Sequence, residues 1–335
     1  MQEKIVFTVV KNEAPFLLEW IAFQKVIGFD RVVIYTNGCT DLTDPLCAAL
    51  AEQGVIEHRI CAQATGSPQG HASWLFRKSE GVKPGDWLMF CDPDEFLNIK
   101  FGEGRVDDLI ARIAGYRGIM VPWRLFGDSG HLQYRGRSVS VDYQLAALPT
   151  HPDRRVVKSF YEYGSDVLAI GVHVPEMAAS FWEGGPSFAS SRLTAIDPTL
   201  AAYSAWREVG QHATCDSSDS TYEHVQMNHY FVRSVACYAI KYDRGPGGVK
   251  PEEILQKQRQ YYGGNKFEAA NTNYVQDSSI LRHLPQLDRK LAELLAIPAV
   301  NEIQARIVAE FQAFEAEFLK RNPTWSPPEG DLPAA

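Results

Sequence analysis

Long apolar runs alternate with helical patterns along the first part of the chain. Residues 4–10, KIVFTVV, and residues 31–36, RVVIYT, are continuous and β-branched, which is typical of strands buried on both faces. Between them, apolar residues recur at helical spacing over residues 15–28, where Pro15 suits a first turn and Gly28 suits a stop. This strand–helix–strand order predicts a parallel sheet with a right-handed crossover.

The same alternation continues up to a short acidic segment. Two further helices and two further strands are expected in the segments 45–53, 55–60, 71–80 and 86–91. The acids Asp92, Asp94 and Glu95 therefore follow the carboxyl end of a central strand. In open α/β sheets this is the edge at which ligands bind.

The alternation becomes less regular after residue 100. Clear patterns remain for a helix at 106–113, for strands at 118–126, 155–160 and 167–174, and for a strand end, turn and helix over 227–245. Residues 288–320 are strongly helical, and their polar face carries charges of both signs. We interpret their apolar stripe as packing within the chain or as a subunit contact, since a membrane-surface helix would be basic.

Composition narrows the class of protein. The chain has 335 residues, 45% of them hydrophobic, and a net charge of −8, which argues against wholesale binding to nucleic acid. No apolar stretch has the length of a membrane span, and the N-terminus lacks the plan of a signal peptide, so we expect a cytoplasmic protein with at most peripheral membrane contact. Six scattered cysteines without a C-x-x-C pair indicate reduced, buried thiols.

The segment FCDPDEFLN, residues 90–98, is the strongest candidate for chemistry. Three acids among apolar neighbours are costly to bury without a partner, and a bound cation is the simplest compensation. In the turn after a strand, Asp92 and Asp94 can approach one cation, and their hard oxygen atoms suit Mg²⁺ or Mn²⁺. A solvated acidic turn is the alternative. A calcium-binding EF-hand loop is excluded because Leu97 stands where its sharp turn needs glycine.

Several short segments occur in a characteristic order and spacing. They are Lys11-Asn12-Glu13, Glu19-Trp20, Gly28-Phe29-Asp30, Asp92-Pro93-Asp94-Glu95-Phe96, Phe126-Gly127-Asp128-Ser129-Gly130, Asn228-His229-Tyr230 and Lys241-Tyr242-Asp243-Arg244-Gly245. Together they resemble the GT-A fold glycosyltransferases of the family-2-like and family-92-like group.

This resemblance implies a fold, a domain plan and a function. The implied fold is α/β, with a mostly parallel central sheet flanked by helices and a C-terminal helical extension. The implied plan is a catalytic domain at 1–245 (a nucleotide-sugar half at 1–100 and an acceptor half at 101–245), an extension at 246–325 and a flexible tail at 326–335. The implied reaction moves a sugar from a nucleotide-sugar, a UDP-sugar above all, to a hydroxyl of a glycan or lipid-linked saccharide, with inversion by direct displacement. Mn²⁺ or Mg²⁺ would stabilise the leaving diphosphate.

Roles for the acidic segment follow from the same resemblance. Asp94 is expected to bind the metal directly, and Asp92 to contact the ion, the ribose or a metal-bound water. His229 corresponds to a late histidine that completes the metal shell, the alternative being a satisfied core histidine. Glu95 is expected to orient a ligand or to reach sugar hydroxyls.

The nucleotide contacts expected from the resemblance lie at the ends of the first two strands. Val10, Lys11 and Glu13 would face the nucleoside, although Glu13 also suits a helix N-terminus, where an acid interacts with the macrodipole. Asn37 and Asp41 would contact the base, or else simply make turns. At the other end of the chain, Lys241 and Arg244 would neutralise the diphosphate, or form a solvated basic helix end.

The acceptor side needs a general base to deprotonate the attacking hydroxyl. Asp128 is the first candidate and Glu183 the second. Three aromatic residues, Trp123, Phe181 and Trp182, are expected either to form an acceptor floor or to belong to the core. His173 matches a histidine of the group, and no chemistry is assigned to it.

Two other functions compete with transfer. A non-catalytic nucleotide- or glycan-binding protein on the same scaffold would be expected to lose the metal ligands, which this sequence retains. A nucleotidyltransferase would be expected to carry a glycine-rich loop after the first strand, where this chain reads VVKNEAPF.

Overall fold

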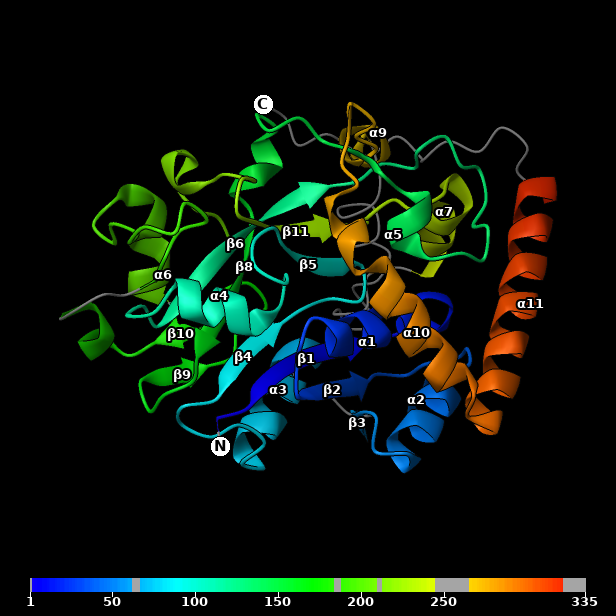
Figure 1. The fold of residues 1–335 in the computed structure, drawn as a ribbon, viewed down its shortest axis with the longest axis horizontal. Helices are drawn as coiled ribbons and strands as arrows, with labels where there is room; N and C mark the ends of the chain where they lie inside the picture. Colours follow the sequence, from blue (N-terminus) through cyan, green and yellow to red (C-terminus); the bar gives the residue numbers. More distant parts are fainter. Residues whose placement is uncertain (1, 62–66, 184–187, 210–212, 245–264, 322–335) are drawn as a thin grey trace.

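One eight-stranded sheet organises the chain, in the strand order β3-β2-β1-β4-β8-β6-β11-β5 (Figure 1). The computed structural model describes residues 2–61, 67–183, 188–209, 213–244 and 265–321. The strands of this sheet are β1 (Lys4–Val10), β2 (Arg31–Thr36), β3 (Glu57–Ile60), β4 (Trp87–Phe90), β5 (Glu95–Ile99), β6 (Gly118–Leu125), β8 (Val157–Glu162) and β11 (Val225–His229). Only β8 and β5 run against the other strands. The predicted α/β class with a mostly parallel sheet is confirmed.

Alternate residues of the central strand β1 supply two separate cores. Ile5 and Phe7 face a core shared with α3 (Pro68–Lys78), whereas Val6 and Val10 face a core shared with α1 (Ala14–Val26) and α2 (Thr43–Glu52). Because successive side chains of a strand point to opposite faces, one apolar run can bury both faces of the sheet. The continuous run KIVFTVV therefore behaves as the sequence predicts.

The remaining elements lie around this framework. Short helices are α4 (Val106–Arg112), α5 (Val139–Asp142), α6 (Ser204–Val209), α7 (Val235–Arg244) and α9 (Lys266–Ala270). Two small antiparallel pairs join β9 (Val167–Ala169) to β10 (Glu176–Met177) and β7 (Leu145–Ala146) to β12 (Val275–Gln276). Short 3-10 helices are η1 (Pro152–Arg155), η2 (Ala179–Glu183), η3 (Ala201–Tyr203), η4 (Ser217–Asp219) and η6 (Ser279–His283).

The expected C-terminal helical extension is present as α10 (Leu284–Leu295) and α11 (Pro298–Arg321). These helices pack against α1 and α2 on one face of the sheet (Figure 1). Leu287, Leu294, Val300 and Ile307 are buried in the same core as the strands, so their apolar stripe is used for packing within the chain. The predicted boundary at residue 245 and the predicted tail at 326–335 lie outside the described residues.

The strand β5 is the main element that sequence patterning did not predict. It begins at Glu95, directly after the turn of the acidic segment, and packs against α1 through Phe96, whose ring lies 5.1 Å from that of Phe23. Two polar residues, Glu95 and Asn98, interrupt its apolar pattern although both are fully buried. Their partners come from distant parts of the chain, so the local pattern gives no signal of burial.

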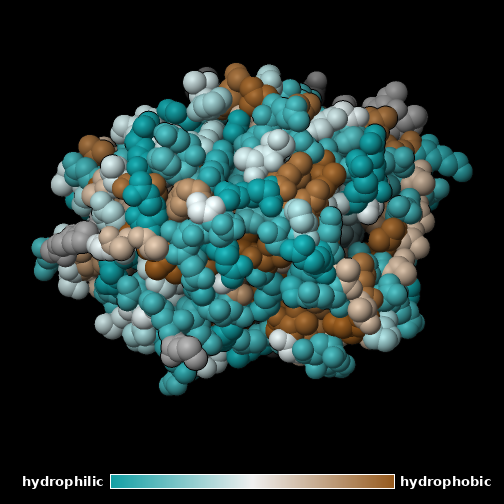
Figure 2. Space-filling model, in the orientation of Figure 1, coloured by the Kyte–Doolittle hydropathy of each residue, from teal (hydrophilic) through white to brown (hydrophobic). Residues whose placement is uncertain are grey.

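The molecular surface in Figure 2 is mostly hydrophilic, with only small and separate hydrophobic patches on the visible face. None of the described helices combines the length and the apolar character that a membrane crossing requires.

Candidate active site

The acidic segment and the Asn228-His229-Tyr230 segment meet at one edge of the sheet. His229 is paired with Glu95 in the antiparallel register between β11 and β5. The backbone N–H of Tyr230 donates a hydrogen bond of 2.8 Å to the carbonyl of Asp94. Two segments more than a hundred positions apart in the sequence are thus joined backbone to backbone, as the site prediction requires.

The carboxylate of Asp94 faces an ammonium and an imidazole. Its Oδ2 lies 2.5 Å from Nζ of Lys241 and 3.7 Å from Nε2 of His229. Burial alone would raise the pKa of this carboxyl, but Lys241 and His229 outweigh it and hold the pKa well below its usual range. Asp94 is therefore an anion at neutral pH, with one oxygen shared between an ammonium and an imidazole.

Asp92 and Glu95 share a lysine that the site prediction did not include. Nζ of Lys158, on β8, lies 2.7 Å from Oδ2 of Asp92 and 3.2 Å from Oε2 of Glu95. Burial alone would lower the pKa of Lys158, but the two carboxylates outweigh it and raise the pKa above its usual value. The cations that compensate the three acids are thus side chains of the protein: Lys158 for Asp92 and Glu95, and Lys241 for Asp94.

Glu95 holds the acidic turn in place. Its Oε2 accepts a hydrogen bond of 2.9 Å from the backbone N–H of Asp92, and its carbonyl accepts one of 3.0 Å from Nε1 of Trp20. Burial raises the pKa of Glu95 to about 7, although the ammonium of Lys158 acts in the opposite direction. Glu95 is fully buried, which places it beneath the site and not on its surface.

Trp123 and two histidines form one wall beside the acids. The ring of Trp123 lies 4.2 Å from that of His229 and 5.5 Å from that of His173. Nδ1 of His173 donates a hydrogen bond of 2.8 Å to the carbonyl of Val157. Nδ1 of His229 has no hydrogen-bond partner within the described ranges. The tautomer of His229 is therefore set by the group that contacts Nε2. Of the predicted aromatic floor, Trp123 is at the site.

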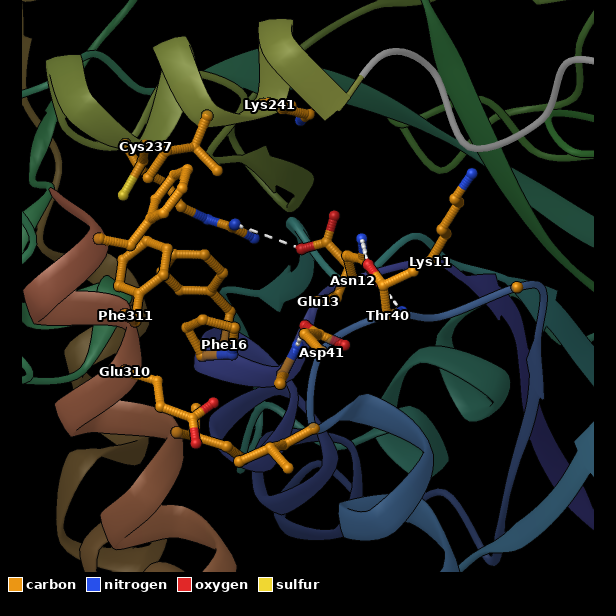
Figure 3. Close-up of a pocket in the computed structure, with 18 of the residues that line it drawn as sticks. Lys11, Asn12, Glu13, Phe16, Thr40, Asp41, Cys237, Lys241, Glu310 and Phe311 are labelled. Atoms are coloured by element: carbon orange, nitrogen blue, oxygen red, sulfur yellow. Dashed lines mark hydrogen bonds and ion pairs between the residues drawn. The ribbon is translucent and has the colours of Figure 1, made fainter. Parts of the chain in front are cut away.

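A cavity of about 590 Å³ is lined by Lys241, the residue whose ammonium contacts Asp94. It is bounded by the end of β1, the loop after β2, α7 with the turn before it, and one face of α11 (Figure 3). Lys11, Glu13, Asp41 and Lys241, four of the predicted nucleotide contacts, line it. Figure 3 shows Phe311 and Glu310 of α11 on the side of the cavity opposite Lys11. The sequence analysis did not predict that the C-terminal helix forms a wall of this cavity.

Arg233 also lines the cavity, and sequence reasoning missed it. Its guanidinium lies 3.4 Å from Oε2 of Glu13 and donates a hydrogen bond of 3.3 Å to the carbonyl of Pro93. The same group lies 3.6 Å from the ring centre of Phe16. These contacts connect the end of β1 with the acidic turn, and they give Glu13 a partner other than the helix macrodipole.

Asp41 combines a place in the cavity wall with a structural role. Its two carboxylate oxygens accept hydrogen bonds from the backbone N–H groups of Ala14, at 3.3 Å, and Thr43, at 2.9 Å. It therefore caps the starts of both α1 and α2. Val10 and Asn37 lie beside the cavity, where the N–H of Asn37 donates to the carbonyl of Val10 at 3.0 Å.

Asp128, the first candidate for the general base, is held in a network of its own. Its two carboxylate oxygens accept hydrogen bonds from the side-chain amides of Asn271, at 2.8 Å, and Asn273, at 2.9 Å. One of them also accepts from the backbone N–H of Gly130, at 2.8 Å. The carboxylate is buried, and its hydrogen bonds fix the loop after β6 against the segment 271–273.

Glu183, the second candidate, is not brought to the site. It ends η2, where Phe181 lies under the guanidinium of Arg117 at 6.0 Å. Arg117 directly precedes β6, whereas His229 pairs with the last residue of that strand. Phe181 and Trp182 belong to the core on the α3 side and so form no acceptor floor.

Lys241 and Arg244 both belong to α7. Lys241 reaches Asp94, as described above, which favours a role at the site over a solvated helix end. The side chain of Arg244 lies outside the described part of the chain, and its contact with a diphosphate stays a prediction.

The Glu19-Trp20 segment has a structural explanation. Oε2 of Glu19 accepts a hydrogen bond of 2.6 Å from the backbone N–H of Val139, and Oε1 accepts one of 3.1 Å from the hydroxyl of Ser140. Burial raises the pKa of Glu19 to about 7. Glu19 thus anchors the start of α5, and Trp20 anchors the acidic turn.

The donor atoms at this edge fit a divalent ion bound together with a ligand. Oδ2 of Asp94 and Nε2 of His229 are 3.7 Å apart, so one ion can lie ~2.1 Å from each. Asp92 is engaged by Lys158, and no group of three or more His, Cys, Asp or Glu side chains in the described residues is arranged to hold a metal. Mg²⁺ is usually held by one or two carboxylates and completes its shell with waters and substrate phosphates, and Asp94 supplies one such carboxylate.

Comparisons with known proteins agree with the predicted resemblance. The chain is 24% identical over 160 residues to a glycosyltransferase family 92 protein of Ricinus communis, a match that covers 47% of this chain and 28% of that protein. It is 28% identical over 155 residues to a family 92 protein of Oryza sativa subsp. japonica, covering 44% and 25%. The chain is similar to family 92 glycosyltransferases. It spans about a quarter of the length of these relatives.

Other comparisons give weaker matches. No protein-family model matches the chain. Among solved structures, S. aureus TarS in complex with UDP has a TM-score of 0.33 and 12% identity, covering 96% of this chain and 92% of that one. Another TarS structure has a TM-score of 0.33 and 11% identity, covering 95% and 55%. Scores at this level describe only a distant likeness.

Proposed function

We propose that the chain is a glycosyltransferase that moves a sugar from a nucleotide-sugar to a hydroxyl of a saccharide acceptor. The observation that supports this most directly is the meeting of Asp94, His229 and Lys241 beside the cavity that Glu13 and Asp41 also line. The similarity to family 92 glycosyltransferases supports the same reaction class.

In this proposal the nucleoside occupies the cavity and the diphosphate lies at Asp94. Glu13, fixed by Arg233, is placed to accept hydrogen bonds from ribose hydroxyls. Asp94 and His229 would hold Mn²⁺ or Mg²⁺ together with the diphosphate oxygens. The ion would supply Lewis-acid stabilisation of the charge that develops on the leaving group. The donor in this proposal is a UDP-sugar, and the acceptor is a lipid-linked or free glycan.

The residues beneath the site contribute rigidity. Asp92, Glu95 and Lys158 form a mutually compensating set in which Glu95 and Lys158 are fully buried, and Trp20 ties Glu95 to α1. A reaction site gains from such support because its groups must stay close to their productive positions. Neither predicted base enters the proposal, since Asp128 is engaged by asparagines and Glu183 lies near the other end of β6.

The test is calorimetric titration of UDP into the protein with and without Mn²⁺. We expect binding that depends on Mn²⁺ and is lost in Asp94→Asn, while the control Asp107→Asn, an exposed acid on α4, binds as the unmodified protein does. Thermal unfolding of both variants checks that they are folded. Binding that is unaffected by Asp94→Asn or by a chelator would refute the site.

Release of UDP from a panel of UDP-sugars, measured with and without saccharide acceptors, separates the transferase from a non-catalytic binding protein. The proposal requires release or transfer with at least one donor. Tight UDP binding with no turnover of any donor would favour the non-catalytic alternative.

A further inference from the structure

Lys241 occupies the position at Asp94 that a divalent ion needs. Its Nζ is 2.5 Å from Oδ2 of Asp94, and the same oxygen faces Nε2 of His229 at 3.7 Å. Because Oδ2 is the Asp94 oxygen that lies near His229, an ion held by both residues would compete with the ammonium for it. Ammonium and metal ion repel each other, so they cannot share it at contact distance.

Two other cations near the site, Lys158 and Arg233, are fixed more firmly than Lys241. Lys158 has no exposed side-chain surface and contacts two carboxylates. Arg233 is held by Glu13, by a backbone carbonyl and by the ring of Phe16. Both side chains therefore belong to the fixed structure around the site.

Lys241, by contrast, is held at the cavity wall by contacts that it can exchange. Besides Asp94, its ammonium meets the carbonyl of Phe231 at 3.4 Å and the ring of Phe231 at 4.4 Å. A lysine ammonium is a point charge on a flexible four-carbon stem, so it can change partners without moving the helix that carries it. Lys241 also lines the cavity in which the nucleotide is proposed to bind.

We propose that Lys241 is an exchangeable counter-ion of Asp94, a positioning residue that couples metal binding to diphosphate binding. Without ligand, its ammonium neutralises Asp94. When a nucleoside diphosphate binds together with a divalent ion, Asp94 and His229 would hold the ion, and the ammonium of Lys241 would exchange Asp94 for a phosphate oxygen. Metal alone binds weakly because it displaces an ammonium that has no new partner. This inference rests on the proposed function, because it assumes that a diphosphate binds here.

Two variants and one control test the exchange. Lys241→Met keeps the length of the side chain and removes its charge, and Lys241→Arg keeps the charge. Lys290→Met removes a lysine from a solvent-exposed pair on α10 and serves as the control. Mn²⁺ affinity is measured by electron paramagnetic resonance of the free ion, with and without UDP, and thermal unfolding confirms that each variant is folded.

Removal of the ammonium should shift the two affinities in opposite directions. Lys241→Met is expected to bind Mn²⁺ alone at least ~5-fold more tightly and UDP at saturating Mn²⁺ at least ~5-fold more weakly, since one competitor and one phosphate contact are lost together. Lys241→Arg and Lys290→Met should bind Mn²⁺ alone no more tightly than the unmodified protein.

Parallel weakening of both affinities in Lys241→Met, or an unchanged affinity for Mn²⁺ alone, would overturn the exchange. A failure of the proposed function looks different, because the unmodified protein would then show no Mn²⁺-dependent UDP binding at all.

Discussion

The ammonium of Lys158 lies 2.7 Å from the carboxylate of Asp92, and the lysine side chain has no exposed surface. Replacing Lys158 by Met would leave Glu95, equally buried, without its cation. Removing one partner of a buried ion pair typically costs ~3–5 kcal/mol, because the remaining carboxyl must either stay charged without compensation or take up a proton. We therefore expect Lys158→Met to lower the free energy of unfolding by about that amount, as measured by urea denaturation at pH 7.

The matched control is Lys290→Met, because Lys290 pairs with Glu293 on the surface. Exposed pairs contribute little, so this change should stay within ~0.5 kcal/mol. If both lysine variants lost the same small amount, Lys158 would not be the compensating cation of the acidic turn.

Neutralising the acid together with the lysine should recover stability. In Lys158→Met/Glu95→Gln, the uncompensated charge is gone while the amide oxygen can still accept the hydrogen bond from the N–H of Asp92. We expect the double variant to be more stable than Lys158→Met by ~1–3 kcal/mol, a coupling that a double-mutant cycle measures directly. A double variant that is less stable than Lys158→Met would show that Glu95 contributes more as a charged group than as a hydrogen-bond acceptor.

The sequence was sufficient to locate the acidic segment at the edge of a sheet, but not to identify its partners. Lys158 reaches Asp92 because β8 lies antiparallel to β4, with Met89 opposite Phe160. That register depends on packing across the whole sheet. The local sequence shows only a single lysine in the apolar run VVKSF and does not reveal its partner.

The positions of the two candidate bases, Asp128 and Glu183, depend on contacts that the local sequence does not show. Asp128 is flanked by glycines and serine in a way that suggests an exposed loop, yet its partners Asn271 and Asn273 come from a segment far along the chain. Glu183 follows two aromatic residues that bury themselves in the α3-side core near the start of β6. The local sequence shows that a carboxylate stands at each position, but the tertiary contacts determine what each carboxylate touches.

His173 should make the protein sensitive to acid. Burial lowers its pKa from 6.5 to about 4, helped by the nearby ammonium of Lys158. The unfolded chain therefore binds a proton near pH 6.5 that the folded chain does not bind until about pH 4, so this group reduces stability as pH falls through that window. A shift of this size corresponds to ~3 kcal/mol between pH 7 and pH 4.

The variant His173→Asn isolates this contribution. An asparagine amide can donate to the carbonyl of Val157 as Nδ1 does, but it does not titrate. We expect the unfolding free energy of His173→Asn to fall less between pH 7 and pH 4 than that of the unmodified protein. Parallel pH profiles for the two proteins would mean that the folded state protonates His173 as readily as the unfolded state.

Phe314 tests whether α11 takes part in nucleotide binding. This residue lines the cavity and is 50% exposed, so truncation should leave the free energy of unfolding almost unchanged. A nucleobase that stacks on an aromatic side chain gains ~1–3 kcal/mol. We therefore expect Phe314→Ala to weaken Mn²⁺-dependent UDP binding by ~5- to 10-fold in calorimetry.

Leu168→Ala is the matched control for that measurement, because Leu168 is a large apolar residue with 48% exposure and lies on β9, away from the residues that line the cavity. A selective loss in Phe314→Ala would show that the C-terminal helix contributes to the nucleotide site itself. If both variants bind UDP as the unmodified protein does, the base must lie toward the loop after β2, and α11 would serve only to cover the apolar faces of α1 and α2.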